Sequence, residues 1–269
     1  MNLVDIGANL THESFADDLD EVLSSAAAVG VNKIILTGTD LASTEAALTM
    51  AEANPQLFAA TAGFHPHVAS TFKQQELLRI SELASHPQVV AVGETGLDFN
   101  RNFSPKEAQL QAFEQHLQLA VHLSKPVFLH QRDAHDEFLR LLSKYRADLS
   151  GGVVHCFTDS EAALDEYLQL DMYIGITGWI CDERRGKDLQ QLVGKIPANR
   201  LLIETDAPYL LPRTIVPKPK TRRNEPKYLP EIVKTIAKYS DRSAESIARD
   251  SSANAVRLFE LGTGLSADR

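Results

Sequence analysis

Four apolar runs of this chain each end at a residue whose side chain can bind a metal ion. The four residues are Glu94, His130, His155 and Asp206. In an eight-stranded α/β barrel, the carboxyl ends of the strands bring such side chains into one pocket. Two imidazoles and two carboxylates that meet there form the ligand set of a divalent-metal hydrolase. The pattern therefore predicts these four residues as metal ligands.

The two carboxylates also suit catalysis. Asp206 is the natural base, since it can take a proton from a water that a cation has acidified. Glu94 lies between glycines at the end of an apolar run and can bridge metals. Ordinary structural roles remain open: Glu94 can instead accept hydrogen bonds from loop amides, and His130 can be a buried histidine satisfied by its neighbours.

A second set of side chains is predicted around the same pocket. His65 and His67 form a turn after another apolar run, where His65 can donate a proton to a leaving oxygen and His67 can bind phosphate. Solvent-exposed loop histidines are the alternative. Arg132 lies two residues after His130, so in an extended strand both side chains lie on the same face. The guanidinium of Arg132 would then bind a phosphate of the substrate.

Basic residues are concentrated in one loop. Six Lys or Arg residues and one acid, Glu225, lie between Arg213 and Lys227, directly after Asp206, in a chain of net charge −9. The overall charge argues against nonspecific coating of nucleic acid, whereas a basic loop beside a metal pocket suits a phosphate-bearing substrate. We predict that Arg223 in this loop binds substrate. A solvated surface loop is the alternative.

Further basic and aromatic residues follow other strands. Arg101, Arg132, Arg184 and Arg185 would share the rim of a barrel and bind a phosphodiester. Phe103, Trp179 and Tyr209 could stack on bases there, although core packing or lid contacts are the more frequent role for each.

The elements that must position these residues alternate along the chain. Strands are predicted at Leu3–Ile6, Lys33–Thr37, Leu57–Ala62, Val89–Gly93, Pro126–His130, Gly152–His155, Met172–Ile176 and Arg200–Glu204. Helices are predicted near 15–29, 43–53, 74–85, 105–124, 133–147, 160–170, 185–195, 227–239 and 252–260. Eight such repeats predict a (β/α)8 TIM barrel of the α/β class. An open doubly wound sheet fits the sequence less well, because no glycine-rich phosphate-binding motif follows the first strand.

Length and composition agree with this class. A chain of 269 residues with 43% hydrophobic residues suits one barrel, which we place at 1–261 with a tail at 262–269. It shows neither an apolar run of about 18 residues nor a secretory signal. Cys156 and Cys181 form no CxxC motif, which fits a reducing compartment. We expect a cytoplasmic monomer without a membrane partner.

Several motifs together resemble one family, the TatD-type metal-dependent deoxyribonucleases. They are Gly63-Phe64-His65-Pro66-His67, Gly93-Glu94-Thr95-Gly96-Leu97-Asp98, His130 with Arg132, His155-Cys156-Phe157, Glu204-Thr205-Asp206-Ala207-Pro208 and Arg223-Asn224-Glu225-Pro226. The resemblance runs from about Val4 to Phe259. It implies a metal-dependent exonuclease that removes nucleotides from the 3′ end of single-stranded DNA, and of RNA, in DNA repair or nucleic-acid degradation.

The chain departs from the family pattern in its first strand. Most members have His-x-His there, whereas this chain has Gly7 and Asn9. Glycine offers no side-chain ligand and asparagine is a weak one, so a site built on Glu94, His130 and His155 would hold metal loosely. Such oxygen-rich ligation without thiolates favours Mg²⁺, with Mn²⁺ or Zn²⁺ as alternatives.

Two rival functions share these features. A deacylase that acts on aminoacyl-tRNA would use the same metal and the same basic rim. A nucleic-acid-binding protein with a weakened metal site is favoured only by Gly7 and Asn9. An amidohydrolase of the deaminase type needs the missing His-x-His pair, which argues against it.

Overall fold

The computed structural model describes residues 2–262, over which eight strands alternate with helices. The strands are β1 (Leu3–Ala8), β2 (Val31–Leu36), β3 (Phe58–Ala62), β4 (Val89–Asp98), β5 (Val127–Arg132), β6 (Gly152–Val154), β7 (Tyr173–Ile176) and β8 (Leu201–Ile203). The helices are α1 (Leu19–Ala28), α2 (Leu41–Ala53), α3 (Gln74–Ala84), α4 (Lys106–Leu123), α5 (His135–Tyr145), α6 (Glu161–Gln169), α7 (Lys187–Leu192), α8 (Leu229–Lys238) and α9 (Ala244–Phe259).

The strands follow one another in a single sheet, in the order β1 to β8. The described pairings are parallel, and a parallel bridge between Ala8 and Ala207 joins the end of β1 to the segment after β8. β1, β3, β6, β7 and β8 are buried along their whole length, as in a sheet that is covered on both faces. The predicted (β/α)8 barrel is thereby confirmed.

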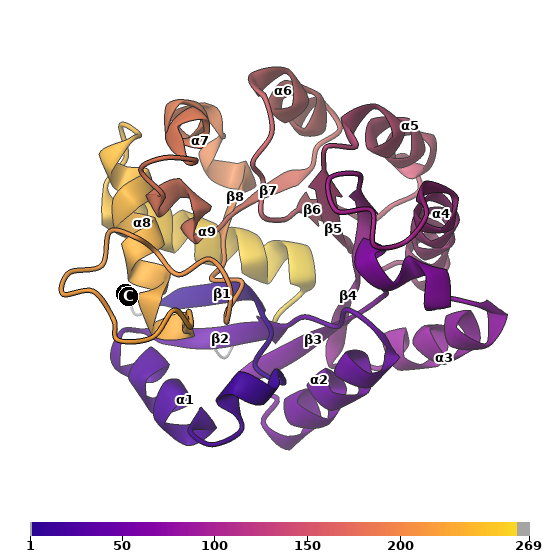
Figure 1. The fold of residues 1–269 in the computed structure, drawn as a ribbon, viewed down its shortest axis with the longest axis horizontal. Helices are drawn as coiled ribbons and strands as arrows, with labels where there is room; N and C mark the ends of the chain where they lie inside the picture. The colour runs from indigo at the N-terminus through magenta and orange to yellow at the C-terminus, as the bar shows by residue number, and fades with distance from the viewer. Residues whose placement is uncertain (1, 263–269) are drawn as a thin grey trace. The chain divides into compact units, whose positions relative to one another are not determined.

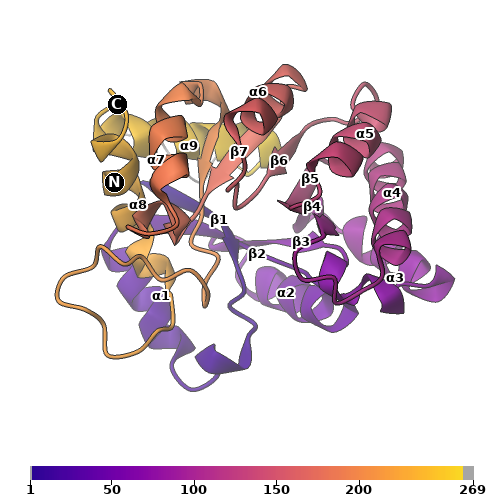
Figure 2. The ribbon, with the colours of Figure 1, turned by 45° about the horizontal axis from the view of Figure 1, so that its top comes forward.

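The chain divides into two compact units. Residues 37–173 form the first, in which α2, α3 and α4 lie outside β3 and β4 (Figure 1). The flanking residues form the second, in which α9 packs against β1 and β8 (Figure 2). The single domain expected over 1–261 stays a prediction, and the tail expected at 262–269 lies, apart from Gly262, outside the described residues. No helix described between residues 2 and 262 has the length and hydropathy needed to cross a bilayer.

Strand β4 is longer than the sequence predicted. We placed its end at Gly93, which was wrong, because the strand continues to Asp98. Gly93 and Gly96 have φ angles of 141° and 143°, and a Cβ on either would overlap a carbonyl oxygen of β5, that of Phe128 or His130. Both glycines therefore let β4 lie close against β5. As a result, Glu94 lies inside the strand rather than after it.

The first and last helices also begin elsewhere than predicted. α9 starts at Ala244 rather than near 252, because the side chain of Ser243 accepts a hydrogen bond from the backbone of Ser246 and caps the helix. α1 starts at Leu19 rather than near 15, since a short 3-10 turn at Glu13–Phe15 comes first.

Candidate metal centre

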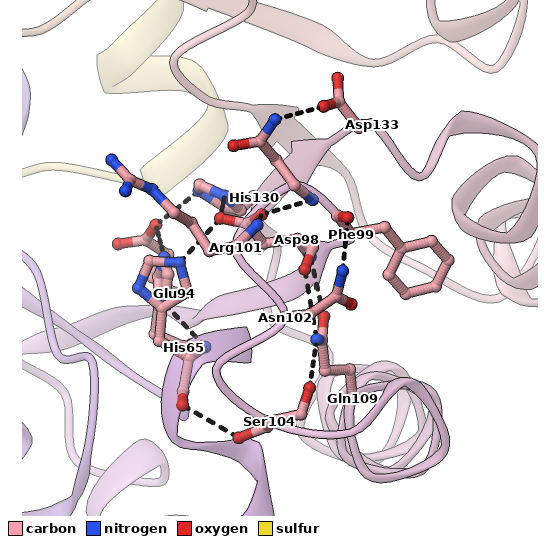
Figure 3. Close-up of polar contacts among 12 residues, drawn as sticks. His65, Glu94, Asp98, Phe99, Arg101, Asn102, Ser104, Gln109, His130 and Asp133 are labelled. Carbon is pink, nitrogen blue, oxygen red and sulfur yellow. Dashed lines mark hydrogen bonds and ion pairs between the residues drawn. The ribbon is translucent and has the colours of Figure 1, made fainter.

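The centre of the candidate site is the carboxylate of Glu94, which is buried. Three imidazole nitrogens surround its Oε1 atom. The distances are 3.2 Å to Nε2 of His65, 3.1 Å to Nδ1 of His130 and 2.8 Å to Nε2 of His155. Figure 3 shows His65 and His130 converging on Glu94. Potential ligand atoms of His65, Glu94 and His130 all lie within 4.8 Å of one another, close enough to surround one ion.

Four consecutive strands of the first unit supply these side chains. Glu94 belongs to β4 and His130 to β5, while His155 directly follows β6. His65 lies after β3, as the N-cap of a 3-10 helix at Pro66–Thr71. Because parallel strands end at the same edge of a sheet, residues far apart in the sequence meet here.

A buried histidine of α4 fixes the backbone beside His65. His116 accepts a hydrogen bond at Nε2 from the amide of Phe64, at 3.1 Å, and its Nδ1 contacts the carbonyl of Ala112 at 2.7 Å. Burial lowers the pKa of His116 to about 4 and keeps the ring neutral, as an accepting nitrogen requires. His116 thus has a structural role, and the sequence reading did not identify it.

His65 itself is oriented by a local hydrogen bond. Its Nδ1 accepts a hydrogen bond from the amide of His67 at 3.1 Å, and its Nε2 faces Glu94. A neutral ring with an accepting Nδ1 carries its proton on Nε2, so that His65 presents an N–H to the carboxylate. Burial lowers the pKa of His65 to about 4. This arrangement suits a hydrogen-bond donor better than a metal ligand.

His130 lies between two carboxylates. Its Nδ1 faces Glu94, and its Nε2 lies 3.6 Å from Oδ2 of Asp98. That Nε2 atom is buried and has no hydrogen-bond partner within the described residues. A histidine that binds metal through one nitrogen commonly donates its other N–H to a carboxylate, and Asp98 is the carboxylate that faces this nitrogen of His130. The donors present thus fit a divalent cation.

The charges at the centre are mutually stabilising. Burial by itself raises the pKa of Glu94, but His155, His65 and His130 outweigh it and hold the pKa well below its usual range. Burial also opposes protonation of His130, but the neighbouring carboxylates of Asp98 and Glu94 raise its pKa overall. Glu94 is therefore ionised at neutral pH and available to a cation.

Asp98 is a residue that the sequence reading left without a role. It is buried, and its Oδ2 lies 2.7 Å from Nε2 of His67 as well as facing His130. Its Oδ1 accepts hydrogen bonds from the amides of Asn100 and Arg101. Asp98 therefore connects two histidines to the loop after β4. Asp98 lies four residues after Glu94, so in a strand of this length both side chains lie on the same face. A prediction of the full length of β4 would therefore have placed Asp98 at the site.

β5 continues to Arg132, two residues beyond His130, where we predicted its end. His130 and Arg132 are half-buried while Gln131 between them is buried, so the strand is extended and the two side chains share a face. Gln131 turns away, and its amide nitrogen donates to Asp159 and Tyr167.

Asp206 and Arg223 belong to the second unit. The amide of Asp206 donates to the carbonyl of Gly7, and its Oδ1 accepts from Nδ2 of Asn9 at 3.4 Å. Asn9, at the place of a first-strand histidine, is thus the neighbour of Asp206. The guanidinium of Arg223 donates to both oxygens of Asp18, at 2.8 and 2.6 Å, and to Glu225.

Comparisons with known proteins agree with this architecture. A family profile described as TatD related DNase matches residues 4–260. A relative named 3'-5' ssDNA/RNA exonuclease TatD, from Musicola paradisiaca, is 50% identical, over 97% of this chain and 98% of its own length. The relative of the same name from Citrobacter rodentium is also 50% identical, over 96% and 98%.

Two solved structures have the same fold. The YJJV TatD homologue from Escherichia coli has a TM-score of 0.86 and 29% sequence identity, over 96% of this chain and 98% of that one. A TatD family hydrolase from Entamoeba histolytica has a TM-score of 0.88 and 27% identity over the same shares.

Proposed function

Because the chain belongs to the TatD-related DNase family, we propose that it is a metal-dependent 3′–5′ exonuclease of single-stranded DNA and RNA. The observation that supports the proposal most directly is the buried carboxylate of Glu94, whose Oε1 atom is contacted by ring nitrogens of His130 and His155. Relatives about 50% identical over nearly the whole chain are named for this activity.

We propose Glu94, His130 and His155 as the metal ligands, with Mg²⁺ as the ion and Mn²⁺ or Zn²⁺ as alternatives. Carboxylate and imidazole donors without thiolate support this order. A divalent cation held there would polarise the phosphate and activate water for attack. Asp98 would hold the Nε2 proton of His130, so that Nδ1 keeps its lone pair for the ion.

Other residues of the chain would orient the substrate and move protons. The Nε2–H of the neutral His65 ring, next to Glu94, would act in catalysis by donating a hydrogen bond to a leaving oxygen. His67 and Arg132 would contact phosphate, as would Arg223, although ion pairs to Asp18 and Glu225 engage its guanidinium. Asp206 as a fourth ligand and as the base that orients water is proposed from its sequence position alone.

The test uses Glu94→Gln, which keeps the size of the side chain and removes its charge. Single strands labelled at the 3′ or the 5′ end are incubated with Mg²⁺ or Mn²⁺, and the order of product release gives the polarity. We expect the wild type to shorten strands from the 3′ end, and Glu94→Gln to lose at least about 100-fold in rate and its metal binding in calorimetry. Glu107→Gln, an exposed position in α4, is the control.

The proposal would be wrong if Glu94→Gln retained metal-dependent release. Charged tRNA in a parallel reaction separates the nuclease from a deacylase, because only the latter frees the amino acid. Cytoplasmic location, the monomeric state and a part in DNA repair stay predictions.

A further inference from the structure

An exposed aromatic ring stands beside the candidate metal centre. Phe103, in the loop between β4 and α4, has a relative exposure of 67%. Its ring centroid lies 4.8 Å from that of His67, in an edge-on contact. The ring of His67 in turn lies 4.2 Å from that of His65. A single imidazole therefore separates Phe103 from a ring that contacts Glu94.

The loop that carries Phe103 is held at both ends. On one side, Asp98 accepts hydrogen bonds from the amides of Asn100 and Arg101, at 3.0 and 2.8 Å. On the other side, the buried Ser104 donates to the carbonyl of His67 at 2.9 Å and accepts from the amide of Ser70 at 3.0 Å. Phe103 is therefore exposed on an ordered backbone, and a ligand that covers its ring pays little ordering entropy.

The same loop adds a positive charge toward the metal centre. Figure 3 shows the side chain of Arg101 extending from the loop toward Glu94. Within residues 2–262 the structure shows no ion pair of this exposed guanidinium. One loop thus carries a cation on the side of the centre and an open aromatic face two residues later.

We propose that this loop binds one nucleotide of the substrate, with Arg101 on its phosphate and Phe103 stacked on its base. The inference rests on the proposed nuclease function and assigns the part of the substrate that the loop contacts. Arginine matches phosphate geometrically and stays charged. Every base has a planar face, so stacking on Phe103 would accept any sequence, as a degradative exonuclease requires.

The test separates the base from the rest of the substrate. Wild type and Phe103→Ala are compared on a single strand with normal bases and on one whose three 3′-terminal nucleotides are abasic. Binding is measured by fluorescence anisotropy in EDTA, and nucleotide release by initial rates with Mg²⁺. We expect Phe103→Ala to weaken binding of the normal strand by about 5- to 150-fold, the range of one aromatic–base stack. We expect a change of less than about 2-fold on the abasic strand.

Two further variants control for packing. Phe103→Trp should restore binding because it keeps a stacking face, whereas Phe103→Leu, which keeps apolar bulk alone, should not. Leu78→Ala removes another exposed apolar side chain of the same unit, 60% exposed in α3, and should have no effect.

The outcomes are distinct. An equal loss on both strands, or no loss on either, overturns the stacking inference and leaves the nuclease in place. A wild type that neither binds nor shortens single strands rejects the nuclease function and the inference together.

Discussion

Replacing Asp98 by Asn tests whether a carboxylate behind His130 strengthens the metal centre. The substitution keeps the size of the side chain and an oxygen for the loop amides of Asn100 and Arg101. It removes the charge that lies 2.7 Å from Nε2 of His67 and 3.6 Å from Nε2 of His130. An amide nitrogen facing those N–H groups cannot accept from them, so His130 loses the group that fixes its tautomer.

The expected cost follows from this geometry. Loss of a carboxylate behind a metal-bound histidine typically lowers metal affinity or activity by about 10- to 100-fold. This corresponds to roughly 1.4 to 2.8 kcal/mol. We expect the midpoint for Mn²⁺ in titration calorimetry, and for activation of nucleotide release, to rise by that factor.

Asp133→Asn is the matched control for this prediction. Asp133 accepts a hydrogen bond from Nδ2 of Asn100 at 2.6 Å and thus holds the same loop, but it is exposed and its described contacts include no histidine. If Asp98→Asn bound Mn²⁺ as tightly as the wild type, or if Asp133→Asn were equally affected, Asp98 would have no specific part in the centre.

Two predictions concern the scaffold. Gly96→Ala should destabilise the protein by about 1–3 kcal/mol or more, because its φ of 143° and the carbonyl of His130 leave no room for a Cβ. The control Gly194→Ala should be nearly neutral. Equal melting temperatures of the two variants would refute this prediction. Burial raises the pKa of Asp5 to about 7, so its stabilising contribution is complete below pH 4 and is lost as the pH rises to 7. Between those pH values, the free energy of unfolding of the wild type should fall by up to about 4 kcal/mol relative to Asp5→Asn, and parallel urea-unfolding curves would contradict the assignment.

The periodicity of the chain was sufficient to predict the fold. Continuous apolar runs that alternate with helical segments specify buried parallel strands, and eight repeats close a barrel. Glu94, His130 and His155 could be selected because each comes after such a run, and the strand ends of a barrel converge. Apolar runs and their spacing are local features, so they can be recognised in a single sequence.

Only the tertiary structure decided which atoms meet and in what protonation state. The length of β4 depends on Gly93 and Gly96 lying against β5, a contact between segments about 35 residues apart in the sequence. Because β4 continues to Asp98, the carboxylate of Asp98 faces Nε2 of His130. Likewise, the burial that keeps His116 neutral is a property of the packed molecule. Long-range packing sets these contacts and pKa values, and residue types and spacing alone do not contain it.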